Sequence, residues 1–378
     1  MKALLINTSF HPNFGGVENS FRSISEALSL KEWDVDIIAS DNFKLPSTDF
    51  KYGARILRYK QRKFGLSFLE IKKLLKNLNV ESYDLIISRS ALTSLALCSV
   101  KIHNFNFIVP GVYKYQNTPT PSFLKKLKYS MHCYIEKQSF KKSHHIFVFS
   151  KSMKSQIQTI IKNKNINMVE PGVDIQRFSP ASDEEQDQFR GKYNIPKNKK
   201  VILCIGRFVK IKNFQTMLSA MPYISEDFIL VLVGDGDELQ SYKDIIFKNQ
   251  LSDRVFIFEK TAKPEQFYKL SDFFCLPSTY EPFGQVLLEA TCSGLPIIAL
   301  DQSIKNIDTA TNDIYTGYPE LVTYIPQNTP ESFAAIFNNI SSTKKTISAS
   351  CIEFSKKHSW DSLISKLQFN NKSNFTDI

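Results

Sequence analysis

Short apolar runs alternate with amphipathic segments along nearly the whole 378-residue chain. In the first half the apolar runs are "KALLIN", "DVDIIAS", "YDLIISR", "FNFIVP", "HHIFVFS" and "INMVEP", and helical periodicity follows some of them over residues 17–31, 120–142 and 151–163. A second series begins after "PKNKK" with "KVILCIG", "FILVLVG", "RVFIFE", "DFFCLP" and "PIIAL". Such alternation is typical of repeated βα units. The pattern predicts an α/β protein with two doubly wound, Rossmann-like domains facing a cleft.

The boundary between the two series defines the expected domains. A chain of this length exceeds what one core usually supports. The polar stretch "SPASDEEQDQ", residues 179–188, is the expected linker. We therefore expect a first domain over 1–180, a second over 181–355, and a C-terminal helical segment over 356–378 that packs back on the first domain.

The composition is that of a soluble globular protein, with 42% hydrophobic and 22% charged residues. No uninterrupted apolar run approaches the roughly 18 residues that a membrane span needs. The start, "MKALLINTS", has too short an apolar core for a signal peptide. These features lead us to expect a cytoplasmic protein.

Two carboxylates stand eight positions apart in "LPSTYEPFGQVLLEATCSGLPIIAL", residues 276–300. Glu281 lies in the turn after a predicted strand, and Glu289 lies in the helix that follows. Ligands of open parallel sheets bind outside the carboxyl ends of the strands. The backbone N–H groups of Phe283 and Gly284 would be unpaired there, because the first turn of a helix has no internal acceptors for them. The alternative is that Glu281 caps the helix and Glu289 is solvated.

A neighbouring turn carries positive charge. In "CIGRFVKIKNFQTML" a predicted strand ends at Gly206, and Arg207 and Lys212 flank the start of a helix. A guanidinium can bind phosphate oxygens in pairs, and an ammonium adds a point charge. This turn is therefore a candidate anion site.

Further glycine turns follow other predicted strands. "LVGDGDEL" contains Gly234 and Gly236, and "NTSFHPNFGGVENS" places Gly15 and Gly16 between the first strand and the first helix. Each turn alone is a weak signal, since glycine commonly serves only to make a tight turn. Together they favour a site for a diphosphate-sized anion and a hydroxyl-rich group beside two carboxylates.

The chain resembles the GT-B glycosyltransferases of family four, which are retaining enzymes that use nucleoside-diphosphate sugars. The motifs that carry the resemblance are "FGGVENS", "VEPGVDIQRFSP", "GRFVKIKN", "LVGDGDE" and "LPSTYEPFGQVLLEA", in this order over nearly the whole chain. A Glu, seven intervening residues and a second Glu in that context mark this family.

The resemblance implies roles for the residues of these motifs. Glu289 would hold the donor ribose, Glu281 would bind the transferred sugar, and Arg207 and Lys212 would contact the diphosphate. The implied catalytic residues are Glu281, Arg207 and Lys212, and the implied donor-binding residues are Gly16, Gly206, Arg207, Lys212, Gly234, Gly236, Phe283, Gly284, Gln285, Val286 and Glu289. The family needs no metal or other cofactor. Retention in it is described as front-face attack, so neither Glu need be a covalent nucleophile.

Two positions depart from the family pattern. Many relatives carry a His after the fourth strand of the first domain, whereas this chain has Pro110 and Gly111 in "NFIVPGVYKYQ". Tyr113 and Lys114 are the nearby candidates for contacts to the acceptor. The usual glycine-containing loop after "PIIALD" is replaced by "QSIKNIDTATNDIYTG".

Other interpretations rest on single features. Asp235 and Asp237 resemble the metal-binding triplet of single-domain glycosyltransferases, but they follow a strand within a second complete sheet. A dinucleotide dehydrogenase is disfavoured because no G-x-G-x-x-G follows the first strand. His144 and His145 have no accompanying acidic or thiol cluster in the sequence. A non-catalytic nucleotide-sugar fold that binds a membrane or nucleic acid remains an alternative, although no nucleic-acid module is recognisable.

Positive charge is concentrated in the first half of the chain. Residues 1–180 contain 27 Lys or Arg against 13 Asp or Glu, and residues 51–164 contain 22 against 4. The segment "SFLKKLKYSMHCYIEKQSFKK" places apolar residues along one face with Lys125, Lys126 and Lys128 around it, as in an interfacial helix. In this family the first domain generally receives the acceptor. We therefore expect a lipid-linked glycan acceptor and peripheral contact with the anionic inner face of the plasma membrane, in surface polysaccharide assembly.

The donor is less well defined by the sequence. UDP-hexose is the preferred expectation, and base choice is expected to depend on backbone contacts near "FIFEKTAKP".

Overall fold

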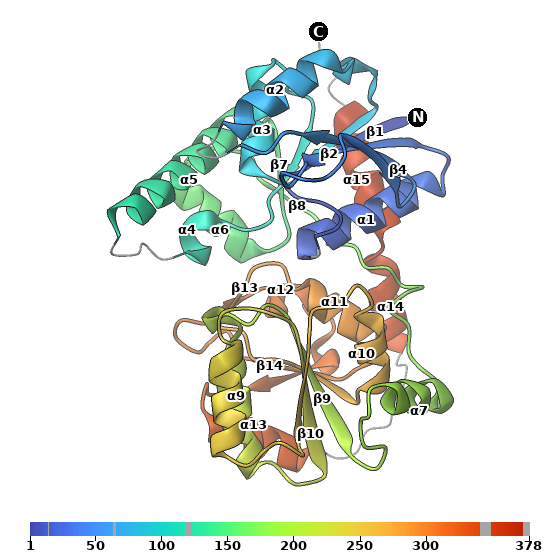
Figure 1. The fold of residues 1–378 in the computed structure, drawn as a ribbon, viewed down its shortest axis with the longest axis vertical. Coiled ribbons are helices and arrows are strands. Elements are labelled where there is room, and N and C mark those ends of the chain that lie inside the picture. Colours follow the sequence, from blue (N-terminus) through green and yellow to red (C-terminus); the bar gives the residue numbers. More distant parts are fainter. Residues whose placement is uncertain (14, 63–65, 118–121, 341–348, 373–378) are drawn as a thin grey trace. The chain divides into compact units, whose positions relative to one another are not determined.

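The computed structural model describes residues 1–13, 15–62, 66–117, 122–340 and 349–372. The chain forms two compact units (Figure 1), the first comprising Met1–Gly172 with Trp360–Ile378 and the second Val173–Ser359. The observed boundary precedes the expected one at residue 180, because Val173 and Phe178 pack in the core of the second unit. The expected segment 356–378 is likewise divided: α14 (Ala349–Lys357) belongs to the second unit and α15 (Trp360–Lys372) to the first. Residues 373–378 of that segment lie outside the described residues.

The first unit is built on an eight-stranded sheet with the order β3-β4-β2-β1-β5-β6-β7-β8. Its strands are β1 (Lys2–Ile6), β2 (Asp34–Ser40), β3 (Thr48–Lys51), β4 (Ala54–Tyr59), β5 (Leu85–Ser88), β6 (Asn106–Ile108), β7 (His145–Val148) and β8 (Asn167–Met168). All neighbours are parallel except β3 and β4. The chain order reverses between β1 and β5, which makes their carboxyl ends the topological switch point of this sheet.

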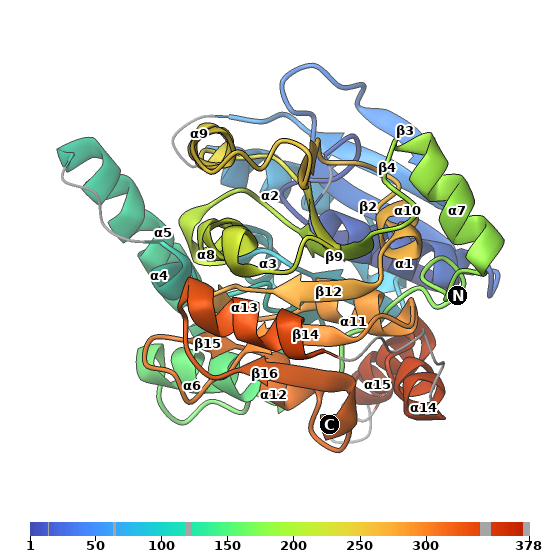
Figure 2. The same cartoon turned by 90° about the horizontal axis from the view of Figure 1, so that it is seen from below.

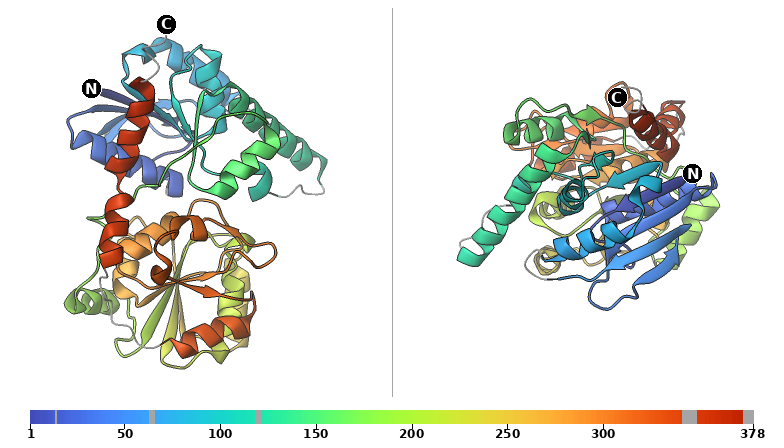
Figure 3. Two further views of the ribbon diagram at one scale, coloured as in Figure 1. Left: turned by 180° about the vertical axis from the view of Figure 1, so that it is seen from behind. Right: turned by 90° about the horizontal axis from the view of Figure 1, so that it is seen from above.

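Helices cover both faces of the first sheet. They are α1 (Gly16–Ser29), α2 (Ser67–Asn77), α3 (Ala91–Ser99), α4 (Tyr113–Gln116), α5 (Phe123–Lys142), α6 (Lys151–Ile160) and α15. Helices α2, α3 and α5 pack in series on one face, and α1 and α15 lie together on the other. Figure 3 shows that the N-terminal part of α5 extends beyond the sheet. The expected helix 120–142 begins outside the described residues and continues as α5.

The second unit is a parallel six-stranded sheet with the order β11-β10-β9-β12-β14-β16 and a small two-stranded sheet β13-β15. Its strands are β9 (Lys200–Ile205), β10 (Phe228–Val233), β11 (Val255–Phe258), β12 (Phe273–Leu276), β13 (Tyr280–Glu281), β14 (Ile297–Leu300), β15 (Asp308–Thr309) and β16 (Val322–Ile325). Its helices are α7 (Asp183–Lys192), α8 (Phe214–Ala220), α9 (Leu239–Lys248), α10 (Glu265–Leu270), α11 (Gln285–Cys292), α12 (Thr311–Ile314), α13 (Pro330–Asn339) and α14. The switch point lies between β9 and β12.

Two apolar layers sandwich this second sheet. Helices α8, α9 and α13 pack on one face, whereas α10, α11, α12 and α14 pack on the other (Figure 2). The central strands β9, β10, β12 and β14 are buried on both sides, which explains why they appear as continuous apolar runs in the sequence. The predicted fold class, an α/β protein of two doubly wound Rossmann-like domains, is confirmed.

The expected linker 179–188 is wrong in its second half, because helix α7 begins at Asp183. The side chain of Ser182 accepts the backbone N–H of Glu185, and Glu185 accepts the backbone N–H of Ser182 in return. This capping box explains why such a polar sequence starts a helix.

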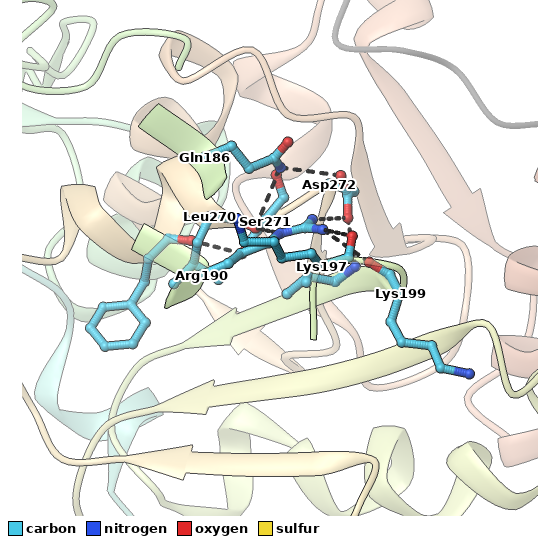
Figure 4. Close-up of polar contacts among 9 residues, drawn as sticks. Gln186, Arg190, Lys197, Lys199, Leu270, Ser271 and Asp272 are labelled. Atoms are coloured by element: carbon cyan, nitrogen blue, oxygen red, sulfur yellow. Dashed lines mark hydrogen bonds and ion pairs between the residues drawn. The ribbon is translucent and has the colours of Figure 1, made fainter. Parts of the chain in front are cut away.

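Helix α7 is joined to the sheet by Arg190, which is 5% exposed (Figure 4). Its Nε donates to the carbonyl oxygen of Leu270 at 2.9 Å, and its Nη2 donates to Asp272 Oδ2 at 2.6 Å. Its Nη1 donates to the carbonyl oxygens of Lys197 and Lys199 at 3.0 and 3.1 Å. The polar segment is therefore an integral part of the second unit.

Within the described part of the chain, no helix is long and apolar enough to cross a membrane.

Candidate functional site

The turn after β12 brings Glu281 and Lys212 together. Glu281 ends β13, and its Oε2 forms an ion pair with the ammonium of Lys212, which ends the short 3₁₀ turn after β9. The two side chains are only 11% and 14% exposed. Thus the carboxylate and the cation predicted from separate motifs lie side by side, at the carboxyl ends of the two strands that flank the switch point.

Gly284 makes the sharp entry into α11. Its φ of +71° lies in the left-handed region, and an added Cβ would lie 2.6 Å from Ile314 Cδ1. Only glycine meets both conditions without strain. The turn leaves Phe283 buried and Gln285 and Val286 half-buried in the first turn of the helix.

Glu289 lies inside the second unit rather than in solvent. It is 6% exposed, and Tyr268 on α10 donates its hydroxyl hydrogen to Glu289 Oε2 at 2.8 Å. Burial raises the pKa of Glu289 to about 7, opposed by the Tyr268 hydrogen bond and by the nearby charge of Arg177. A carboxylate held this way can accept hydrogen bonds from the hydroxyls of a ligand, and binding would favour its ionised form.

The remaining second-unit residues surround the carboxyl ends of β9 and β10. Gly206 follows β9, and a Cβ on Gly234 would lie 1.9 Å from the carbonyl oxygen of Gly206, so the two strand ends approach closely. Gly236 follows in the same turn as Gly234. Arg207 is exposed and pairs with no carboxylate among the described residues, which leaves its guanidinium available to an anion.

Gly16 lies in the first unit, where it is the first residue of α1. It is exposed, and an added Cβ would meet nothing within 4 Å. The structure of this unit therefore leaves space for a ligand at the Gly16 backbone.

The first unit also contains a large cavity, of about 1010 Å³, beside its own switch point. Residues after β1, β5 and β6 line it together with side chains of α5, of which Leu124 and Leu127 are themselves largely exposed. Its lining includes Asn7, Arg89, Gly111, Tyr113, Leu127 and Glu136.

Glu136 is the buried acid of this cavity. It is 6% exposed, and its Oε1 accepts the backbone N–H of Tyr113 at 2.9 Å. Its Oε2 has no hydrogen-bond partner within the described ranges. Burial raises the pKa of this carboxyl to about 7. The ring of Tyr113 stacks on His132, with the centroids 4.8 Å apart.

Asp235 of the acidic triplet and His144 of the histidine pair each contact another residue of the described chain. Asp235 is exposed and pairs with Lys260 at 3.1 Å. His144 stacks on His103, with the ring centroids 4.9 Å apart. No group of three or more His, Cys, Asp or Glu side chains in the described part of the chain could hold a metal ion.

Sequence reasoning missed three polar residues of these sites. Tyr268 and Arg177 act on Glu289, and Glu136 lies in the cavity of the first unit. Tyr268 and Glu136 lie in helical patterns that look like ordinary amphipathic faces. Arg177 lies in the quoted motif "VEPGVDIQRFSP", so the sequence drew attention to this residue, but it could not show that Arg177 pairs with Glu265.

The chain matches two family patterns. The family described as "Glycosyl transferases group 1" matches residues 185–358, and that described as "Glycosyltransferase Family 4" matches residues 14–177. The two matches together span most of both units.

Individual relatives agree with these matches. The chain is 25% identical to an uncharacterized glycosyltransferase of Methanocaldococcus jannaschii, over 79% of this chain and 80% of that protein. It is 31% identical to N-acetyl-alpha-D-glucosaminyl L-malate synthase of Bacillus anthracis, over 38% of this chain and 41% of that protein.

Solved structures share the fold over the whole chain. Sucrose-phosphate synthase from Thermosynechococcus elongatus has a TM-score of 0.76 at 19% identity, with full coverage of both chains. HepE of Anabaena, in complex with UDP and glucose, has a TM-score of 0.74 at 17% identity, with 99% of this chain and 100% of that chain covered.

Proposed function

Because the chain belongs to the GT-B glycosyltransferases of the family-four type, we propose that it is a retaining enzyme that transfers a hexose from UDP-hexose to a glycan acceptor. The observation that carries the proposal is the placement of Glu281, Lys212 and Glu289 beside the switch point of the second sheet. The complex of HepE with UDP and glucose supports the choice of donor.

The donor would be held both by carboxylates that accept hydrogen bonds and by backbone groups that donate them. Glu289 would accept the ribose hydroxyls, and Glu281 would accept hydroxyls of the hexose. The backbone N–H groups at the start of α11, where Gly284 allows close approach, would add donors for the diphosphate or the sugar.

Charge stabilisation would supply most of the catalysis. Breaking the glycosyl–phosphate bond builds negative charge on the departing diphosphate, and preorganised cations lower that barrier. Arg207 would pair with phosphate oxygens. The ammonium of Lys212 has three donors, so it can face the diphosphate while it stays on Glu281. On this account the reaction needs no metal ion.

The ion pair also bears on retention. Glu281 Oε2 is paired with the ammonium of Lys212, and this pairing makes the carboxylate a weaker nucleophile than an unpaired one. We therefore assign Glu281 to sugar binding, with the acceptor attacking from the face that the diphosphate leaves.

The acceptor would enter the cavity of the first unit. Its apolar lining comes from α5 and its polar lining from the strand ends, which suits an amphipathic molecule such as a lipid-linked glycan. Glu136, which accepts the backbone N–H of Tyr113 and lines the cavity with Pro110 and Gly111, would provide a polar group where many relatives carry a His.

The exposed N-terminal part of α5, which also lines the cavity through Leu124 and Leu127, would contact an anionic membrane. Phe123, Leu124 and Leu127 are 79%, 75% and 60% exposed. Lys125, Lys126 and Lys128 surround them, and each Lys near an anionic surface contributes roughly 1 kcal/mol. We propose a peripheral enzyme at the inner face of the plasma membrane that extends a lipid-linked glycan in surface polysaccharide assembly.

A thermal-shift panel tests the proposed donor. UDP, GDP, dTDP and ADP, each alone and with a linked hexose, are added to the purified protein. A ligand at a hundredfold excess over its dissociation constant stabilises the folded state by about 2.7 kcal/mol. Stabilisation by UDP and its hexose conjugates is the expected result. Stabilisation by another base would replace the donor, and no response to any nucleotide would contradict the proposed function.

A further inference from the structure

Arg177 forms a clamp inside the second unit. Its backbone N–H donates to Asp174 Oδ1 at 3.0 Å, which fixes the loop that carries it. Its guanidinium Nε donates to Glu265 Oε2 at 2.9 Å, and Nη2 donates to the carbonyl oxygen of Ala262 at 2.6 Å. Both charged side chains are largely shielded, at 15% and 20% exposed. The clamp therefore joins the Val173–Phe178 loop to residues 259–265, which are distant in sequence.

The clamped segment lies where a ligand of this sheet is expected. Residues 259–264 follow β11 and lead into α10, so they stand at the carboxyl end of an edge strand. Base choice was expected from backbone contacts in the same stretch. Arg177 bonds the main-chain carbonyl of Ala262, so it fixes the path of the backbone itself.

A chain of contacts runs from the clamp to Glu289. The Arg177 Cζ lies 5.2 Å from the centroid of the Phe178 ring, and the Phe178 ring meets the ring of Tyr268 edge-on at 5.5 Å. Tyr268 in turn donates its hydrogen bond to Glu289. The segment that follows β11 and the carboxylate on α11 are thus linked through packed side chains.

The charge of Arg177 also affects Glu289. The polar and titratable groups that face Glu289 are Tyr268 and Glu265 of α10, Gln285 and Cys292 of its own helix, and Arg177. Arg177 lowers the pKa of Glu289 against the effect of burial, and Glu265 raises it. Loss of the guanidinium would therefore leave Glu289 protonated to a higher pH.

We propose that Arg177 is a positioning residue of the nucleotide site: it holds residues 259–265 in the path that receives the base, and it keeps positive charge near the carboxylate that receives the ribose. The inference rests on the proposed function, since its ligand is the nucleoside diphosphate. One side chain thereby couples base discrimination to ribose binding.

Calorimetric titration of R177M with UDP, GDP, dTDP and ADP between about pH 6 and pH 9 tests this coupling. At pH 7 we expect R177M to bind the preferred nucleotide about tenfold more weakly than wild type, which is the scale of one lost charge-assisted hydrogen bond. Part of the loss should be recovered at high pH, where Glu289 ionises again. The preference among the four bases should also decrease.

Three further variants separate the roles of the clamp. R177K keeps the charge but not the paired geometry. The pH at which nucleotide affinity is half recovered, the pH midpoint, should therefore stay as in wild type, while the preference among the four bases should be lost. E265Q breaks the same ion pair from the other side, so it should lose base preference while the pH midpoint moves lower. K248M removes a charge from an exposed residue at the end of α9, outside this segment, and should behave as wild type.

The outcomes distinguish the inference from the function. If R177M matches wild type in affinity, base preference and pH midpoint, the clamp has no role in binding. If R177M is weakened by one constant factor at every pH and for every base, Arg177 is merely structural and the inference fails. If R177M does not fold, R177K and E265Q decide by the same criteria. If wild type binds none of the four nucleotides, the proposed function fails, and the inference fails with it.

Discussion

Replacing Glu289 by Gln should change how the stability of the protein depends on pH. The substitution keeps the size of the side chain and an oxygen that can accept the hydroxyl hydrogen of Tyr268. It removes a carboxyl whose pKa rises from 4.5 in the unfolded chain to about 7 in the fold, because it is buried. The folded protein therefore holds this proton more tightly than the unfolded chain does.

The size of the effect follows from the difference between the two pKa values. Each pKa unit corresponds to about 1.4 kcal/mol, so the wild type loses on the order of 3 kcal/mol of unfolding free energy as the pH rises from about 4.5 through about 7. E289Q has no such loss. The difference in unfolding free energy, variant minus wild type, should grow by about that amount over this pH range.

Urea denaturation without ligand, followed by circular dichroism, measures this difference. Fluorescence is less suitable because both tryptophans, Trp33 and Trp360, lie in the first unit. Glu136 also titrates near pH 7, but it is present in both proteins and cancels in the difference. E331Q, at an exposed position of the same unit, is the matched control and should show no growth with pH. A constant difference between E289Q and wild type from about pH 4 to pH 8 would refute the reasoning.

The remaining predictions concern other parts of the molecule. Arg207→Ala should lower turnover about a hundredfold while the fold survives, as when one preorganised charge partner is lost; steady-state kinetics measure this, and near-normal turnover would remove Arg207 from catalysis. EDTA should leave the wild type active, whereas strict dependence on a divalent ion would favour the acidic-triplet mechanism. The protein should float with anionic vesicles at low salt, and changing Lys125, Lys126 and Lys128 to Glu should abolish this; no flotation of wild type would favour a soluble acceptor. Arg190→Ala should cost on the order of 3 kcal/mol of unfolding free energy in urea denaturation, because it removes the buried guanidinium that bonds half-buried Asp272 and three backbone carbonyls; a loss below about 1 kcal/mol would contradict that account.

The core strands of both units could be predicted from the sequence because burial on both faces leaves an unbroken apolar signature. "KVILCIG" and "FILVLVG" became β9 and β10 in this way. The strand β3, "TDFK", could not be recognised, since it is a short edge strand with mixed polarity. Helix α7 was mistaken for a linker because its many charged residues conceal both its capping box and the hydrogen bonds that Arg190 makes to the sheet.

The candidate site was only partly predictable for a different reason. Glycine turns after strands identify the edge of a sheet where ligands bind, so Gly206, Gly284 and the neighbouring charges could be found from local sequence. The pairing of Lys212 with Glu281 joins two turns that are distant in the sequence, and only the strand order β9-β12 makes them neighbours. The same holds for Tyr268, whose hydroxyl reaches Glu289 from a different helix.

Calorimetric titration of Glu281→Ala and Glu289→Ala with UDP and with UDP-hexose tests the central claim most directly. Glu289→Ala should weaken binding of both ligands, because the ribose is common to them. Glu281→Ala should weaken UDP-hexose and leave bare UDP at least as tightly bound as in wild type, since Lys212 is then released from its carboxylate partner. Equal losses of bare-UDP affinity in the two variants would contradict the assignment of ribose and hexose to these two carboxylates.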